Sequence, residues 1–189
     1  MLEMKAPSRS LARLCTSKHA GGFTLVELMV TIAIATLLMM VAVPNYIAFQ
    51  RNAMLSDAVN SFMTAVNTAR GNAIKQGRRT YLVPLDGTNW SSGWRVYADV
   101  NWDGVYTVGT DELVFESAAP SSALTITTPT GSSLASSYLL FNGSGYPKMS
   151  NGALATGKIV MTNAYRSSTV NIDGTGRVRS CKTGTTGCP

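Results

Sequence analysis

Glu27 is a carboxylate in a run of residues, 23–43, that is otherwise uncharged and mostly apolar. The run is about as long as a helix that crosses a hydrocarbon core, since such a helix needs roughly 20 residues. A charged side chain at that depth is costly unless a partner compensates for its charge. We therefore expect Glu27 to have a functional partner.

The 22 residues before this run form a basic leader without an apolar core of its own. The leader holds four basic residues and one acidic residue, and it ends with Gly21 and Gly22. A secretory signal peptide has its apolar region before the cleavage site, whereas here the Gly-Gly pair comes first. Removal of the leader would thus leave the apolar run on the mature chain. The positive-inside rule predicts a cytoplasmic leader and an extracytoplasmic C-terminal domain.

The sequence Gly-Phe-Thr-Leu-Val-Glu at residues 22–27 resembles the processing site of type IV prepilins and type II secretion pseudopilins. The resemblance implies that a membrane-bound prepilin peptidase cuts between Gly22 and Phe23 and methylates the new amine of Phe23. Glu27 then has a partner for filament assembly, because the Phe23 amine of a neighbouring subunit is a cation at nearly the same depth.

Arg177 and Arg179 are the second candidate for chemistry, in a Gly-Arg-Val-Arg sequence that begins at Gly176. In a strand their side chains would point the same way, while Val178 faces the core. Two guanidinium groups on one face suit phosphate oxygens, and Gly176 would let a backbone approach closely. The motif resembles the DNA-binding motif of FimT-type minor pilins, which implies contacts to the DNA backbone. An ordinary exposed strand end or a contact to another subunit is the alternative.

Basic residues are concentrated near the two ends of the chain. Residues 23–140 hold six basic and eight acidic residues, whereas residues 141–189 hold six basic residues and one acidic residue. Lys182 follows the two arginines, and it joins them in the candidate DNA-binding set. This asymmetry indicates either a polyanionic partner or a solvated basic surface. Further cations expected on neighbouring strands are Lys148, Lys158 and Arg166.

Residues 99–104 read Asp-Val-Asn-Trp-Asp-Gly and resemble the opening of an EF-hand calcium loop. That loop needs a glutamate at its twelfth position, where this chain has Thr110. A β-turn at Asp103 and Gly104 between two strands explains the residues without a metal, and calcium binding is the alternative. The stretch from Gly93 to Gly104 is also similar to a segment of the GspH/FimT/FimU minor-pilin domain. That similarity implies a minor rather than a major filament subunit.

The cysteine and histidine content argues against a catalytic site. His19 and Cys15 lie in the leader and would be lost on cleavage. Cys181 and Cys188 remain, and an even pair in an extracytoplasmic domain predicts a disulfide between them. Closing this short loop would contribute about 2.5 kcal/mol on chain-entropy grounds. With no Cys–His pair and no phosphate-binding glycine loop, the sequence predicts no enzyme, no metal site and no cofactor.

A single long helix is expected from Phe23 to about Gln76, roughly 80 Å at 1.5 Å per residue. Pro44 is expected to kink it or to open it locally. Beyond Pro44 the pattern turns amphipathic, and its apolar stripe is expected to cover a sheet rather than to form a partner groove. The stripe consists of Phe49, Leu55, Val59, Phe62, Val66, Ala69, Ala73 and Ile74.

After Gly77, which is expected to end the helix, short strand-like runs alternate with turn residues. Their connections are too short for helical crossovers, so antiparallel pairing is expected. Residues 143–147 and 150–152 are predicted to be turns, and residues 117–137 a long loop between two halves of the sheet. The predicted strands are 80–85, 94–100, 112–117, 124–128, 138–142, 158–162, 169–172 and 177–181.

These features predict an α+β chain with a type IV pilin-like fold, whose long N-terminal helix packs on an antiparallel β-sheet domain. The expected domains are a cleaved leader (1–22), a transmembrane and assembly helix (23–44), its amphipathic continuation (45–77) and a β-rich periplasmic head (78–189). The predicted function is that of a minor pilin or pseudopilin which supports pilus assembly and binds DNA for uptake through its two arginines. The alternative is a minor pseudopilin of a type II secretion system without DNA binding. Expected partners are other pilins, the bacterial inner membrane, prepilin peptidase and double-stranded DNA.

Overall fold

The computed structural model describes residues 22–185, and its longest element is the helix α1 (Leu25–Gln76). The helix runs through Pro44 without a break, so the proline does not open it. It ends before Gly77, whose φ of +65° lies in the left-handed region that favours glycine. The predicted helix end at Gln76 is therefore confirmed.

Internal contacts divide the chain into a unit up to Ala42 and a unit from Val43 onward. In the described part of the first unit, every residue of α1 is exposed. By length and composition alone, α1 contains a segment that is apolar enough to cross a membrane. Apolar residues without a protein core around them mark a surface that needs lipid or another helix.

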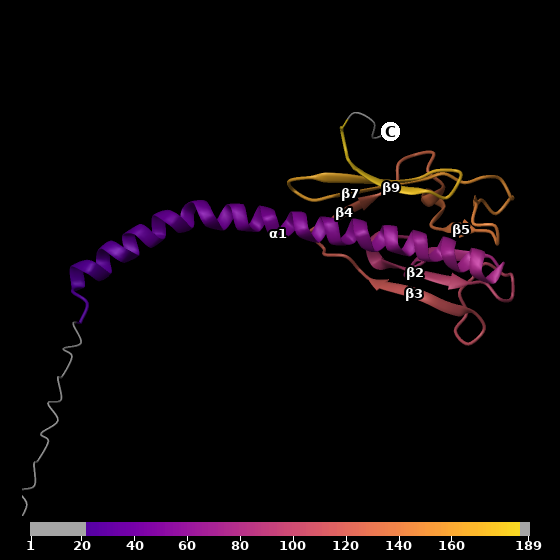
Figure 1. Ribbon diagram of the computed structural model, residues 1–189, viewed down its shortest axis with the longest axis horizontal. Helices are drawn as coiled ribbons and strands as arrows, with labels where there is room; N and C mark the ends of the chain where they lie inside the picture. Colours follow the sequence, from indigo (N-terminus) through magenta and orange to yellow (C-terminus); the bar gives the residue numbers. More distant parts are fainter. Residues whose placement is uncertain (1–21, 186–189) are drawn as a thin grey trace, which may run out of the picture. The chain divides into compact units, whose positions relative to one another are not determined.

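The second unit contains two antiparallel sheets (Figure 1). The five-stranded sheet has the order β3-β2-β1-β5-β6, and the four-stranded sheet has the order β4-β7-β8-β9. Every neighbouring pair is antiparallel, as predicted. The strands are β1 (Thr80–Pro84), β2 (Gly93–Ala98), β3 (Glu112–Ala118), β4 (Thr125–Thr127), β5 (Leu139–Phe141), β6 (Pro147–Lys148), β7 (Gly157–Thr162), β8 (Ser167–Ile172) and β9 (Val178–Lys182).

Two segments differ from the sequence-based expectation. Pro147, predicted to belong to a turn, begins β6, a two-residue strand too short to show any periodic pattern. Residues 117–137 were expected to form a long loop around the predicted strand 124–128. That strand is β4, but the loop also contains the 3₁₀ helix η2 (Ser133–Ser136), which was not predicted. This segment carries the chain from the five-stranded sheet to the four-stranded sheet and back.

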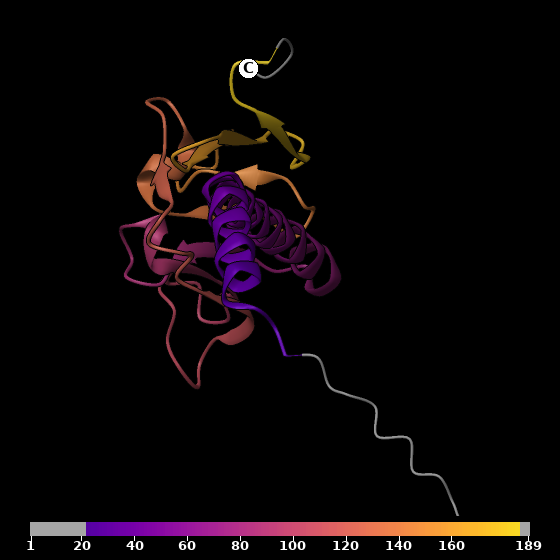
Figure 2. The ribbon, with the colours of Figure 1, turned by 90° about the vertical axis from the view of Figure 1, so that its left-hand side faces the viewer.

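Within the second unit, α1 runs along both sheets and contributes one face to their common core (Figures 1 and 2). The apolar stripe is therefore core, as predicted. Two of its members are not buried, because Phe49 is 70% exposed and Ile74 is 53% exposed. The buried members are Leu55, Val59, Phe62, Val66, Ala69 and Ala73.

Phe62 is the centre of the contact between helix and sheet. Its ring meets the rings of Trp90 and Trp94 edge to face, with centroid distances of 5.5 and 5.3 Å. The indole Nε1 of Trp90 donates to the carbonyl of Leu134 at 3.0 Å. Edge-to-face aromatic pairs add about 0.5–1.5 kcal/mol each beyond the area that they bury. This cluster holds α1 against β2 of the five-stranded sheet and the short helical turn that precedes it.

Candidate functional site

The start of α1 holds the residues predicted for processing and assembly. Gly22 and Phe23 precede the helix, and Phe23 is 81% exposed. The hydroxyl of Thr24 accepts a hydrogen bond from the amide of Glu27 at 3.2 Å, and its carbonyl accepts one from the amide of Leu28 at 3.1 Å. Thr24 is therefore the N-cap, and Glu27 lies in the first turn, where the helix dipole favours a carboxylate.

Thr24 is a functional candidate that the reading of the sequence missed. The signal was present, because Thr-x-x-Glu before an apolar run is the pattern of a capping box. The cap sets the residue at which the helix begins, and it thereby places Glu27 in the first turn. Thr24 therefore stabilises the helical turn that carries Glu27.

Gly22 is not required by packing among the described residues. A Cβ atom added to it would meet no heavy atom within 4 Å. It is also exposed. A requirement for glycine at this position would therefore come from a protein that recognises this segment rather than from the fold.

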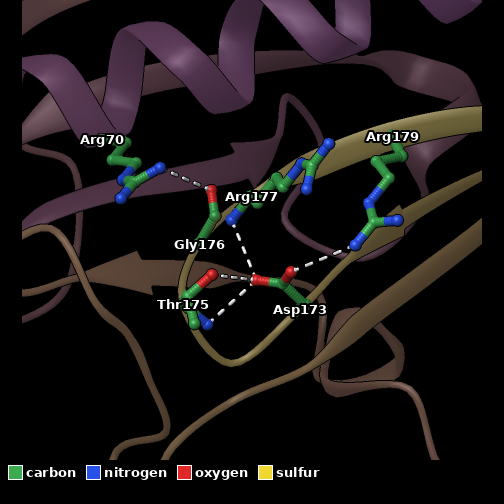
Figure 3. Close-up of polar contacts among 6 residues, drawn as sticks. All are labelled: Arg70, Asp173, Thr175, Gly176, Arg177 and Arg179. Atoms are coloured by element: carbon green, nitrogen blue, oxygen red, sulfur yellow. Dashed lines mark hydrogen bonds and ion pairs between the residues drawn. The ribbon is translucent and has the colours of Figure 1, made fainter.

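The hairpin of β8 and β9 presents the two predicted arginines to solvent (Figure 3). Arg177 is exposed immediately before β9, and Arg179 lies within β9 with 63% of its side chain exposed. Val178 between them packs against the hydrophobic core, as predicted. The two arginines, two residues apart in the sequence, are thus both exposed at one end of the hairpin.

Asp173 organises the loop that carries these arginines. Its Oδ1 accepts from the amide of Thr175 at 2.9 Å, from the Thr175 hydroxyl at 2.5 Å and from the amide of Arg177 at 3.0 Å. Its Oδ2 lies 3.9 Å from Nη2 of Arg179. The Thr175 hydroxyl lowers the pKa of Asp173 most, helped by the two amides and by the charge of Arg179. Ionised Asp173 therefore stabilises the loop above the ordinary carboxylate pKa, and this contribution is lost as the pH falls through the lowered value.

Gly176 packs closely against another part of the same chain. Its φ is +79°, and a Cβ atom there would lie 2.9 Å from the carbonyl oxygen of Gly145 and 3.1 Å from the Phe141 ring. Nη1 of Arg70, on α1, donates to the Gly176 carbonyl at 3.3 Å (Figure 3). The backbone that comes close to Gly176 is therefore that of Gly145, and internal packing explains this glycine without a ligand.

We expect Gly176→Ala to lower the free energy of unfolding by about 1–3 kcal/mol, because it adds left-handed strain and a clash with a backbone atom. Urea unfolding of the purified chain, followed by tryptophan fluorescence, measures the change. Gly174→Ala in the same loop is the matched control, since its Cβ atom would meet nothing within 4 Å. Equal losses for the two variants would contradict this explanation of Gly176.

Lys182 does not join the two arginines, although it was predicted to belong to their set. It lies three residues after Arg179 on β9, and alternation along a strand places the two side chains on opposite faces. Lys182 instead lines a groove of about 300 Å³ between α1 and β9, together with Arg166. The fold therefore divides the predicted DNA-binding set.

Lys158 is the cation that shares a face with Arg179. Lys158 on β7 and Arg179 on β9 both pair with Asn171 on β8, and directly paired residues point to the same side of a sheet. Lys148 lies on β6, in the other sheet. Only Lys158, of these two predicted neighbours, is placed to extend the surface of Arg179.

The predicted disulfide falls partly outside the described residues. Cys181 lies on β9, which is an edge strand of the four-stranded sheet, and Cys188 is not among residues 22–185. The side-chain amide of Asn171 lies 3.9 Å from Sγ of Cys181. The pairing of the two cysteines stays a prediction.

The acidic loop 99–111 is held by its own carboxylates. Asp99 is fully buried and accepts from the amides of Trp102 and Gly104 at 2.7 and 3.2 Å. Asp111 accepts from two further loop amides at 3.0 and 2.8 Å. In residues 22–185, no group of three or more Asp, Glu, His or Cys side chains is placed to hold a metal ion. Backbone bonding thus accounts for the carboxylates, in a loop longer than the predicted two-residue turn.

Comparison with family models matches residues 58–176 to the family described as "Type II transport protein GspH". Residues 17–43 match the model described as "Prokaryotic N-terminal methylation motif". A search of curated proteins found no match.

Among solved structures, the chain is similar to the type IV minor pilin FimU of Pseudomonas aeruginosa PAO1. The two share 15% identity with a TM-score of 0.53, over 69% of this chain and 90% of FimU. The chain is also similar to the minor pseudopilin EpsH from the type 2 secretion system of Vibrio cholerae. That match has 13% identity and a TM-score of 0.48, over 69% of this chain and 98% of EpsH. The likeness to FimU shows a common fold: a long N-terminal helix packed on antiparallel sheets.

Proposed function

Because the chain belongs to the GspH family, we propose that it enters a filament of the type IV pilus or type II secretion kind as a minor pilin or pseudopilin. The observation that carries this proposal is the exposed apolar part of α1, residues 25–43, with the capped Glu27 at its start. An apolar helix of this length is stable in lipid or against equivalent helices of other subunits. The matched family consists of transport proteins, and the chain is a structural subunit rather than an enzyme.

Maturation is part of the proposal. Residues 1–22 are removed by prepilin peptidase, and the new N-terminal residue, Phe23, is methylated. The methylation motif matched at residues 17–43 supports this step. Residues 23–44 then anchor the subunit in the inner membrane, and residues 45–189 lie in the periplasm, because the basic leader stays in the cytoplasm.

Glu27 is proposed to guide each subunit into the filament. In the apolar interior its carboxylate pairs with the methylated amine on Phe23 of a neighbouring subunit. The Thr24 cap supports this role, because it holds the first turn and the carboxylate close to the new terminus. Pairing of two charges at one depth would favour a single axial register.

Maturation is tested by co-expressing the chain with a prepilin peptidase and purifying it from membranes. The expected product begins at Phe23 and carries one methyl group, which intact-mass and N-terminal peptide analysis detect. Gly22→Leu is expected to keep the leader and to remain in the membrane. A product that begins elsewhere, or an unprocessed wild-type chain, would contradict the proposal.

Pilus and secretion system are separated by the phenotype of a deletion strain. Loss of surface pili with normal protein secretion would assign the subunit to a pilus. Loss of secretion with normal pili would assign it to a type II system. Complementation with the wild-type chain controls for effects on neighbouring genes.

DNA binding is a second proposed activity, favoured by the exposure of Arg177 and Arg179 at one hairpin (Figure 3). Guanidinium groups contact phosphates without reading the base sequence. Asp173 lies close to Arg179, whereas no carboxylate within residues 22–185 forms an ion pair with Arg177. Arg177 should therefore contribute more to the affinity than Arg179.

We expect the detergent-solubilised full chain to shift duplex DNA in a gel, weakly and independently of sequence. Arg177→Gln/Arg179→Gln should abolish the shift, and each single variant should reduce the slope of log affinity against log salt by about 1. Lys182→Gln, on the other face of β9, is the matched control and should bind like the wild type. Equal binding by the double variant and the parent would exclude this site, and no binding by either would exclude the activity.

The disulfide between Cys181 and Cys188 is also proposed, on the ground of an even cysteine pair in a periplasmic domain. Thiol titration of the denatured, processed chain should find no free cysteine. Peptide mapping without reduction should recover the two residues in one linked product.

A further inference from the structure

A second cationic surface lies on the second unit, at the end where α1 leaves the apolar run. We define the basal surface as Arg51, Arg166 and Lys182, from α1, from the β7–β8 turn and from the end of β9. Arg166 and Lys182 are exposed, and Arg51 is half-buried. The apolar run ends at Val43, eight residues before Arg51, which is about 12 Å along a helix.

Asn163 fixes the β7–β8 turn to this part of α1. It is 7% exposed, and its Nδ2 donates to the Arg51 carbonyl at 2.8 Å and to Oδ1 of Asn52 at 3.1 Å. Its Oδ1 accepts from the amides of Tyr165 and Arg166 at 2.8 and 2.7 Å. One buried amide thus holds Arg166 beside the helix turn that carries Arg51.

The register of the four-stranded sheet places Lys182 next to Arg166. It pairs with Ser168 on β8, and the amide of Thr183 donates to the Ser167 carbonyl at 3.1 Å. Lys182 and Arg166 line one groove, whose other residues are polar or apolar but not acidic. Within residues 22–185, no carboxylate forms an ion pair with any of the three cations.

Aromatic side chains accompany these cations. Tyr46 on α1 is 66% exposed, Phe49 is 70% exposed, and Tyr165 in the β7–β8 turn is 55% exposed. Tyrosine beside basic residues is typical of the interface between membrane and water. Phe49 belongs to the apolar stripe by its spacing but has no core contact to make, which an interfacial position explains.

The distance of Arg51 from the apolar run matches a lipid headgroup layer. That layer extends about 5–8 Å beyond the hydrocarbon core on each side, and the Debye length at physiological salt is about 8 Å. An arginine about 12 Å beyond the last apolar residue lies within reach, because its side chain can extend back toward the surface. Arg166 and Lys182 line a groove beside Ser56 and Asn60, further along α1 than Arg51, so they reach the headgroups when the helix tilts toward their side.

We propose that the basal surface binds the headgroups of anionic phospholipids while the subunit waits in the membrane before assembly. This inference rests on the membrane anchoring in the proposed function. The surface is distinct from the proposed DNA site. Lys182 lies on the opposite face of β9 from Arg179. Arg51 lies 19 residues, or about 28 Å along α1, from Arg70, which donates a hydrogen bond to the Gly176 carbonyl. The phosphates that the basal surface binds are therefore those of lipid headgroups in the membrane that anchors the subunit.

The test uses the processed full-length chain in lipid nanodiscs. One set of discs contains phosphatidylcholine alone, and the other contains phosphatidylcholine and phosphatidylglycerol in equal parts. Hydrogen–deuterium exchange of the 163–168 peptide should be slower in the anionic discs, and high salt should remove the difference. Removal of each cation should weaken the binding of the basal surface to anionic headgroups about fivefold. This factor corresponds to roughly 1 kcal/mol per basic side chain at a charged membrane surface.

Arg51→Gln/Arg166→Gln/Lys182→Gln should lose the lipid-dependent protection, while Arg177→Gln/Arg179→Gln, as the matched control, should keep it. Equal exchange in both kinds of disc would overturn the lipid site and leave the anchor intact. A chain that does not co-elute with discs would overturn both. A triple variant that keeps its protection but no longer co-purifies with other pilins would assign these cations to an acidic protein partner and so overturn the inference.

Discussion

Replacing Glu27 by glutamine should leave the chain processed and membrane-bound but should lower its incorporation into filaments at least about tenfold. The physical reason is the proposed pair with the Phe23 amine of the next subunit. Removing one member of a charge pair in a medium of low dielectric constant typically costs about 3–5 kcal/mol, and a tenfold effect requires only about 1.4 kcal/mol. The amide keeps the shape of the side chain, so the helix itself is preserved. Immunoblots of sheared filaments and of membranes measure the ratio.

Thr24→Ala separates the charge of Glu27 from its positioning. It keeps the carboxylate but removes the cap on the Glu27 amide, which should destabilise the first turn by about 0.5–2 kcal/mol. Incorporation should fall by less than in Glu27→Gln. Normal incorporation of both Glu27→Gln and Glu27→Ala would show that the carboxylate has no part in assembly.

Replacing Phe62 by alanine should lower the free energy of unfolding by about 3–5 kcal/mol, the range for truncating a buried phenylalanine. Phe62 is fully buried, and its ring contacts the rings of Trp90 and Trp94. The loss combines apolar area, two aromatic contacts and a cavity between helix and sheet. Urea unfolding followed by the fluorescence of these tryptophans measures it directly.

Phe49→Ala is the matched control for this prediction. It makes the same substitution on the same helix, at a side chain that is 70% exposed. Its effect should remain within about 0.5 kcal/mol, as for surface positions in general. A comparable loss in both variants would show that the packing of Phe62 is not what holds α1 on the sheets.

The two basic surfaces are proposed to bind different ligands, although both consist of basic side chains. Arg177 and Arg179 lie at the hairpin end where Gly176 packs against Arg70 and Gly145. Lys182 lies at the other end of β9. Binding of DNA at the first surface and of lipid at the second would not compete for the same cations. The lipid contact would end when the subunit leaves the membrane, while the hairpin arginines keep their exposure in the free subunit.

Local pattern was enough to predict the methylation-motif stretch, the apolar run, the helix end at Gln76 and the eight longer strands. Each of these depends on neighbours within a few residues, through periodicity, turn residues or helix capping. The family resemblance rested mainly on residues 22–27 and on residues 93–104, and the matched family models agree with it. The Thr24 cap was equally local, and its Thr-x-x-Glu pattern was sufficient to predict it.

The position of Lys182, the role of Gly176 and the exposure of Phe49 depended on the fold. Alternation along β9 places the side chains of Lys182 and Arg179 on opposite faces of the sheet, and the turn at Gly145 fills the space beside Gly176. The basal surface depends on Asn163, whose bond to Arg51 joins residues 112 positions apart. A periodic pattern shows which side of an element is apolar, but it does not show which distant segment packs there. Such contacts exist only once the sheets have closed over α1, because their partners come from strands far apart in the chain.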